Sequence, residues 1–232
     1  MFPDVAVVAD LVNGIVAIAQ ANGMAGFTSN TILLGWPTDE ALQVRFLRAT
    51  RYLERLNKSV VLARLAPEAS LPPPEDRVIH VWWGGLQRNS DLMLLLAYLL
   101  ERNPAWRDAR VEVLSAASTE MAKQQTERYL AELIPEIRID ATSRVIIKPR
   151  EQSVAELIHT ESANADVVFL GLGSPAPGEE AAYARRLNVL AEGLPSVCFV
   201  KNASVFIGGL LESTEPAVET QRPEGSVTDR AS

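Results

Sequence analysis

Short apolar runs alternate with longer amphipathic stretches along most of the chain. The apolar runs are five to seven residues long and rich in β-branched side chains, which predicts strands. Most of them are apolar on both faces, as is typical of a parallel sheet with helices on both sides. Strands are expected at residues 5–9, 31–35, 59–65, 77–83, 110–115, 143–148, 166–171 and 196–201.

The stretches between these runs have the period of helices. In residues 39–56, apolar residues recur at spacings of three and four from Leu42 to Leu53, which places them on one helix face. Together with the strands, this alternation predicts an α/β fold with a doubly wound, mostly parallel sheet and right-handed crossovers. Further helices are expected at residues 119–133, 151–162 and 179–192.

Capping and breaking residues define the expected helix ends. Thr38 or Asp39 caps the first of these helices, and Ser118 caps the next, which Pro135 closes. The last helix ends at Gly193, because glycine readily adopts the left-handed conformation that follows many helices.

The series of elements is interrupted once, by four prolines and three acids in residues 67–76. We interpret this segment as an extended polyproline linker between a first α/β subdomain, residues 1–66, and a second, residues 77–211. Residues 212–232 are polar and lack aromatic side chains, which predicts a loose tail. Because the chain opens directly on a strand and a helix, the first subdomain is expected to lack its leading elements.

Charge and hydropathy exclude several classes of protein. The chain of 232 residues has 22 Lys and Arg against 29 Asp and Glu, a net charge of −7, so binding of nucleic acid through a basic face is not expected. The apolar stretch that begins at Leu92 is interrupted by Glu101 and Arg102, well short of the roughly 20 residues of a membrane span. No secretory signal is recognisable, and the single cysteine favours a reducing, cytoplasmic setting.

Candidate catalytic and metal-binding groups are scarce. Two histidines, His80 and His159, are too few for a multi-histidine metal site. We expect His80 in the core or at an edge with a backbone partner, and His159 in a surface pair with Glu156. Cys198 lies within a predicted strand and is expected to be a small buried hydrophobe. The sequence has no G-x-S-x-G motif, so we predict no catalytic residues, no metal, no cofactor and no enzyme activity.

A glycine-bearing turn follows the strand at residues 166–171. Its spacing, G-x-G-x4-G from Gly171 to Gly178, matches neither a dinucleotide fingerprint nor a phosphate-binding loop. Glu179 and Glu180 begin the next helix, where they complement its dipole and would repel a phosphate. A structural turn is favoured, with a nucleotide site as the alternative.

Two adjacent tryptophans end another predicted strand. Trp82 and Trp83 precede a glycine pair, so they could stack a purine, with Arg88 meeting its phosphates. Successive strand residues face opposite ways, so the favoured interpretation puts one ring in the core and the other against a helix or an interface. Tryptophan is enriched at binding hot spots, and a partner surface is a variant of this interpretation.

Three segments, in order, resemble the cytosolic C-terminal domain of the cation-chloride cotransporters. They are residues 11–37, ending in Gly-Trp-Pro; residues 78–115, with the double tryptophan, a leucine-rich run and Trp-Arg; and residues 167–202, with the glycine-bearing turn. The resemblance extends over about residues 5–211. The chain lacks the long phosphorylated insertions of the family's animal members, so it resembles a compact prokaryotic member.

The resemblance implies a domain on the cytoplasmic side of the membrane that regulates and dimerises a symporter of cations, such as potassium, with chloride. It implies two universal-stress-protein-like subdomains, a homodimer, and the transmembrane domain of the same transporter as partner. Stress proteins that bind ATP carry G-x2-G-x9-G-Ser/Thr after the strand at residues 166–171, a pattern lacking here, so no tight ATP binding is expected. The alternative is a stand-alone universal-stress-like protein that binds a nucleotide or signal. Candidate subdomain or subunit contacts are Trp36, Trp82, Trp83 and Trp106.

Overall fold

The computed structural model describes residues 7–21, 23–24, 27–84, 89–137 and 139–203. Its helices are α1 (Leu11–Ala21), α2 (Glu40–Arg55), α3 (Asn89–Glu101), α4 (Glu120–Glu136), α5 (Val154–Glu161) and α6 (Glu180–Ala191). Its strands are β1 (Gly23–Met24), β2 (Phe27–Thr28), β3 (Thr31–Gly35), β4 (Ser59–Arg64), β5 (Val78–Trp82), β6 (Arg110–Ala117), β7 (Ala141–Ile147), β8 (Val167–Gly171) and β9 (Val197–Lys201).

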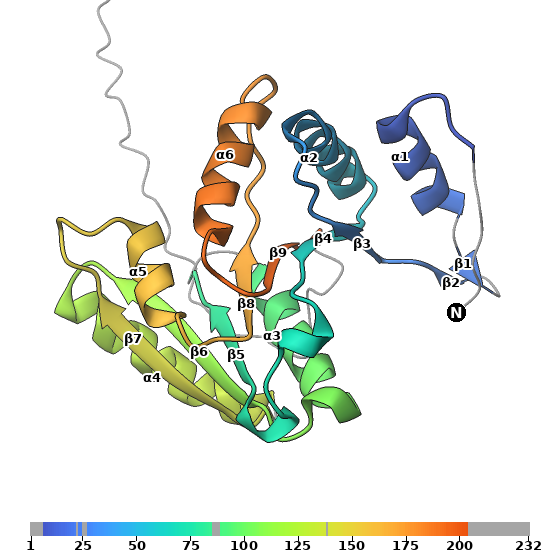
Figure 1. The fold of residues 1–232 in the computed structure, drawn as a ribbon. Helices are drawn as coiled ribbons and strands as arrows, with labels where there is room; N and C mark the ends of the chain where they lie inside the picture. Colours follow the sequence, from blue (N-terminus) through green and yellow to red (C-terminus); the bar gives the residue numbers. More distant parts are fainter. Residues whose placement is uncertain (1–6, 22, 25–26, 85–88, 138, 204–232) are drawn as a thin grey trace, which may run out of the picture.

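The main sheet has seven strands in the order β3-β4-β9-β8-β5-β6-β7, seen in Figure 1. All neighbouring pairs are parallel except β4 and β9. From β5 onward the chain adds two strands on one side and then returns to add β8 and β9 on the other, which is a doubly wound order. The predicted α/β class with a mostly parallel sheet is therefore confirmed.

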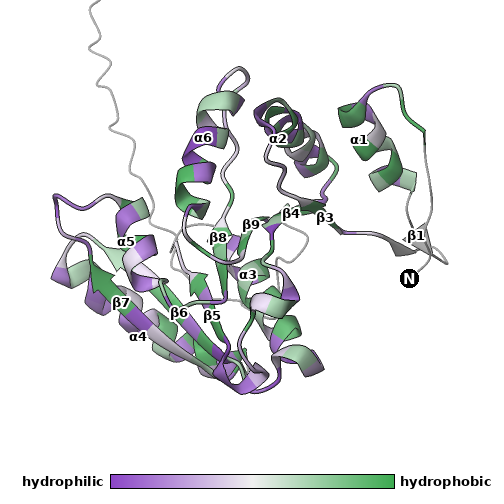
Figure 2. Cartoon of the chain, in the orientation of Figure 1, coloured by the Kyte–Doolittle hydropathy of each residue, from purple (hydrophilic) through white to green (hydrophobic). Residues whose placement is uncertain are grey.

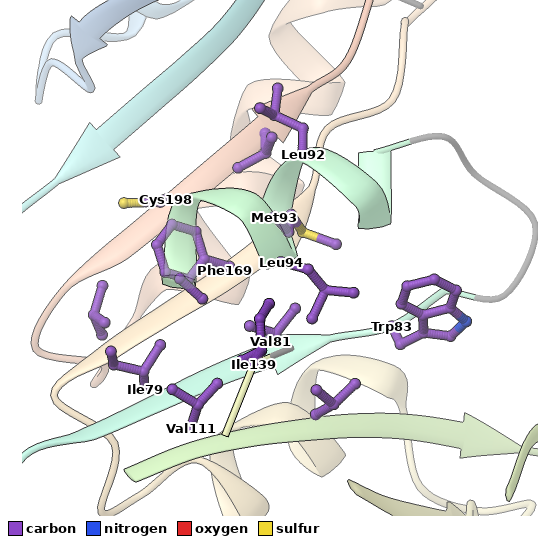
Figure 3. Packing of buried hydrophobic residues seen from close by; sticks show 14 of the residues in the cluster. Ile79, Val81, Trp83, Leu92, Met93, Leu94, Val111, Ile139, Phe169 and Cys198 are labelled. Carbon is purple, nitrogen blue, oxygen red and sulfur yellow. The ribbon is translucent and has the colours of Figure 1, made fainter. Parts of the chain in front are cut away.

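Helices cover both faces of the sheet, each with its own core. On one face, buried side chains of α3 and α4 pack on alternate strand residues such as Val61 and Val113. Figure 3 shows the α3 part of this core. On the other face, α1, α2, α5 and α6 pack on the intervening residues, such as Leu62 and Leu114. The alternation follows from the two-residue period of a strand, and Figure 2 shows the apolar colour along the central strands.

The strand expected at residues 5–9 is not found in its described part. Residues 7–9 have no regular structure, and Val7 is fully exposed. Residues 5 and 6 lie outside the described chain. A strand needs a neighbour for its backbone groups, and the edge strand β3 pairs only with β4 within the described residues.

Two of the expected helix ends are wrong by one or a few residues. Thr119, not Ser118, caps α4, because its Oγ1 accepts a hydrogen bond from the Ala122 amide at 3.2 Å. Pro135 does not close α4 but lies inside its last turn, one residue before the helix ends, where its missing N–H removes one helical hydrogen bond. The caps expected at Asp39 and Gly193 are confirmed: Asp39 accepts from the Leu42 amide at 2.8 Å, and Gly193 has a φ of +73°.

The proline-rich segment is not one extended polyproline stretch. It forms two short 3₁₀ helices, Glu68–Ser70 and Pro74–Asp76, because proline's fixed φ also suits the first turn of a helix. Strands from both sides of this segment meet directly, since β4 pairs with β9. The division into subdomains at residues 67–76 stays a prediction.

Candidate functional site

The carboxyl ends of β5 and β8 mark the point where the strand order reverses, which is where doubly wound sheets bind ligands. Here the buried side chain of Asn89, at the start of α3, bridges neighbouring strand ends. Its Nδ2 donates to the Leu172 carbonyl at 3.1 Å, and its Oδ1 accepts from the Asn202 amide at 2.9 Å. The purine-stacking alternative also used Arg88, which lies outside the described residues.

The first residue of α6 supplies its own buried anion. Glu180 is 2% exposed, and its carboxylate accepts a hydrogen bond from the Gly178 amide at 2.8 Å. Burial alone would raise the pKa of Glu180, but hydrogen bonds from the backbone amides of Glu180 and Gly178 and from Arg51 hold it below its usual value. A carboxylate therefore takes part of the donor set that a phosphate would use at this helix end.

Arg51 of α2 is the partner of this carboxylate. Its Nη2 lies 2.8 Å from Glu180 Oε1 and also donates to the Pro175 carbonyl at 2.9 Å. The pair joins α2 to α6, which lie side by side in Figure 1. The sequence pattern identified Glu180 but not its partner Arg51, because 129 residues separate the two and no local pattern connects such positions.

Trp36 follows β3 and contacts elements beyond the proline-rich segment. Its buried ring packs edge-on against Phe199, with centroids 6.1 Å apart. Its Nε1 donates to Asn188 Oδ1 at 2.9 Å, and Asn188 in turn donates to Gln43 Oε1 at 2.9 Å. A hollow of about 390 Å³ opens beside this network. Trp36 thus lies where residues 1–66 meet residues 77–211, and its role between subunits stays a prediction.

Trp82 and Trp83 face opposite sides of the sheet, as the strand period predicted. Trp82 belongs to the core beneath α5 and α6, and its Nε1 donates to Ser162 Oγ at 3.0 Å. Trp83 belongs to the core beneath α3 and α4, with its ring centroid 5.8 Å from that of Tyr129. Both side chains are buried, so they present little surface to another molecule.

Trp106 is the half-buried member of the four. The Arg77 guanidinium stacks over its ring at 5.0 Å and also donates to the Ala105 carbonyl. Trp106 packs at the margin of the core beneath α3. The four tryptophans therefore do not form one site: two lie on one face of the sheet, one on the other, and Trp106 at a margin.

His80 has side-chain partners, not the backbone partner that we expected. Its Nδ1 lies 3.0 Å from the hydroxyl of the fully buried Ser162, and its Nε2 lies 3.6 Å from Glu112. Burial lowers the pKa of His80, and the nearby Glu112 carboxylate only partly opposes this effect. The expectation fails because the fold brings Ser162, which is 82 residues away in the sequence, into hydrogen-bond distance of the ring.

The surface pair expected for His159 is also wrong. His159 Nε2 lies 3.2 Å from the Leu190 carbonyl, whereas Glu156 forms a capping box with Ser153. Cys198 is buried, and burial raises the pKa of its thiol to about 12, as expected for a small hydrophobe. Among the described residues, no group of three or more His, Cys, Asp and Glu side chains is placed to hold a metal.

An apolar groove lies on the α3 side of the sheet and was missed by sequence analysis. Its volume is about 540 Å³. Leu33 of β3, Leu65 after β4 and Leu99 of α3 line it and are 67%, 65% and 55% exposed. Phe169 and Cys198, which Figure 3 shows beside α3, contribute to its lining. One signal was available in the sequence. The β3 and β4 segments are apolar on both faces, but the only helix between them, α2, can cover just one of these faces.

Comparison with known proteins supports the resemblance seen in the motifs. The model of the family "Solute carrier family 12" matches residues 74–155, which include β5, β6, β7, α3 and α4. A solved structure described as the cytoplasmic domain of a prokaryotic cation chloride cotransporter matches with a TM-score of 0.58 and 20% identity. The match covers 83% of this chain and 69% of that chain.

In the described part of the chain, every helix is too short or too polar to cross a membrane. The resemblance to cation-chloride cotransporters is thus confirmed by two comparisons: this chain has the fold of that cytoplasmic domain, and its residues 74–155 match solute carrier family 12.

Proposed function

We propose that this chain is a cytosolic domain of a cation-chloride cotransporter, and that it regulates and dimerises the transporter without itself moving ions or catalysing a reaction. The observation that carries the proposal is the match of residues 74–155 to solute carrier family 12, together with the fold of a cotransporter cytoplasmic domain. Its partner is the transmembrane domain of its own full-length transporter, beside which the chain lies on the cytoplasmic side.

The packing of the chain is suited to passing a displacement from one end of the sheet to the other. One sheet runs from β3 to β7, and α2 is fixed to α6 by the buried Arg51–Glu180 pair and the Trp36–Asn188 contact. Close-packed interiors transmit displacement because they deform little. A domain of this kind can pass its own movement on to the transmembrane domain of the transporter without a bound cofactor.

Self-association is the part of the proposal that is tested most simply. Sedimentation equilibrium of the 232-residue chain over a range up to high micromolar concentration should show conversion of monomer into a species of twice the mass. A strictly monomeric mass throughout that range would contradict the homodimer.

The alternative, a stand-alone universal-stress-like sensor of a nucleotide or signal, is favoured by one observation, the strand reversal between β5 and β8. The carboxylate of Glu180 at the start of α6 opposes a bound phosphate there. Thermal unfolding with millimolar ATP separates the two, because a ligand that binds only the folded state raises Tm. We expect no change in Tm, and a rise that depends on ATP concentration would favour the sensor.

A further inference from the structure

The apolar groove leaves side chains exposed that a folded α/β sheet normally covers. Leu33 and Leu65 are 67% and 65% exposed although both project from the sheet or its end. Two charged residues line the groove, Glu68 and Arg77, and Arg77 is engaged with the Pro72 and Ala105 carbonyls and with Trp106. The chemistry of the groove therefore suits an apolar occupant.

The described chain ends beside this groove. The Ala203 amide donates to Ser59 Oγ at 3.2 Å at the start of β4. Three residues earlier, Val200 pairs with Val61, which lines the groove. The 29 residues that follow, 204–232, thus continue from the end of the groove at which β4 begins.

We propose that residues 205–211 of the same chain occupy the apolar groove. Their sequence, VFIGGLL, is the longest apolar run after β9, whereas residues 212–232 are polar and include several acids. The groove follows β4 from Val61 to Leu65, which is roughly 13 Å at about 3.3 Å per strand residue. Seven residues reach about 10 Å as a helix and about 23 Å when extended, so the segment matches the groove in length.

Attachment to the same chain favours this occupant over a second copy. A short covalent connection gives a segment a millimolar effective concentration, whereas a free partner loses translational freedom on binding.

The test compares the full chain with two truncations, one ending at Ala203 and the other at Leu211. The readout is the accessibility of the Leu33, Leu65 and Leu99 methyl groups to a soluble paramagnetic probe, measured by ¹³C-methyl NMR. We expect it to rise several-fold in the chain that ends at Ala203 and to stay unchanged in the chain that ends at Leu211. Equal accessibility in the two truncations would overturn the proposal.

Point substitutions at full length remove any concern that truncation alters folding. Phe206→Asp places a charge in the apolar segment and should expose the methyl groups of the three leucines, whereas the matched Val218→Asp in the polar tail should not. Protection that weakens on dilution, in parallel with dissociation seen by sedimentation, would assign the groove to a second copy and overturn docking within one chain. A dimer that survives truncation at Ala203 would leave the proposed function standing whatever the methyl groups report.

Discussion

The buried ion pair between α2 and α6 gives the sharpest test of how the parts of the chain before and after the proline-rich segment are held together. We change Arg51 to Met, which keeps most of the apolar stem and removes the guanidinium. Glu180 then stays in a buried position with its carboxylate facing the vacated site, since only 3% of its side chain is exposed and Arg51 Nη2 lies 2.8 Å away.

The expected loss follows from the burial of the charge. Removing one partner of a buried pair leaves an uncompensated charge and costs about 3–5 kcal/mol. The Arg51 side chain is 19% exposed, and Glu180 keeps both the Gly178 amide and the exposed Arg48, whose Nε lies 3.8 Å from Oε1. We therefore expect a loss of about 2–3 kcal/mol, at or below the low end of that range. For a domain of this size, such a loss lowers Tm by roughly 5–10 °C.

The same two helices supply a matched control. Arg185 of α6 and Glu40 of α2 are also 2.8 Å apart, but their side chains are 63% and 55% exposed. Exposed pairs contribute about 0–1 kcal/mol, so Arg185→Met should cost less than about 1 kcal/mol. Urea unfolding measures both variants, together with Glu180→Gln and the Arg51→Met/Glu180→Gln double variant.

The double variant should lose less stability than the sum of its two single variants, because it removes the charge that Arg51→Met leaves unpaired. The loss in Arg51→Met should also shrink as pH falls far enough to protonate Glu180. Equal losses for Arg51→Met and Arg185→Met, or losses in the double variant that simply add, would refute the assignment of a buried, coupled pair.

Three further changes test other contacts. Trp36→Phe removes the donor to Asn188 Oδ1 and should lower the free energy of unfolding by about 1–2 kcal/mol, measured by urea unfolding; an unchanged value would contradict this hydrogen bond. Burial lowers the pKa of His80 from 6.5, so the unfolded chain takes up the proton first and stability falls as pH drops below 6.5, by at most about 1.4 kcal/mol per unit. His80→Gln should flatten this fall below about pH 6.5 more than His159→Gln does, and equal profiles would be evidence against the buried neutral ring. Gly193→Ala forces a side chain into a φ of +73° and should cost about 1 kcal/mol; no change in Tm would show that the turn tolerates it.

Local patterns were sufficient for the central elements of the fold. The apolar runs predicted β3 to β9. The signal is strongest in β4, β5, β8 and β9, which are buried on both faces, whereas the edge strands β3 and β7 are largely exposed. Hydrogen-bonding side chains such as Asp39 identified helix starts, although the adjacent candidates Ser118 and Thr119 were not resolved. The antiparallel pairing of β4 with β9 was not predictable, because it joins residues that are far apart in the sequence.

The candidate site was harder to predict because its contacts are long-range. The sequence identified Trp36 and Glu180, but their partners Asn188 and Arg51 lie 152 and 129 residues away. The apolar groove escaped prediction for another reason. The groove exists because one face of β3 and β4 is left uncovered. An amphipathic pattern shows which face of an element is apolar, but not whether another element covers that face.

The proposal that this chain belongs to a transporter is tested most directly by the genomic sequence upstream of the codon for Met1. We predict an uninterrupted reading frame that encodes a series of apolar segments, each of about 20 residues. A stop codon in that frame, with translation starting at Met1, would contradict the proposal and favour a free-standing sensor.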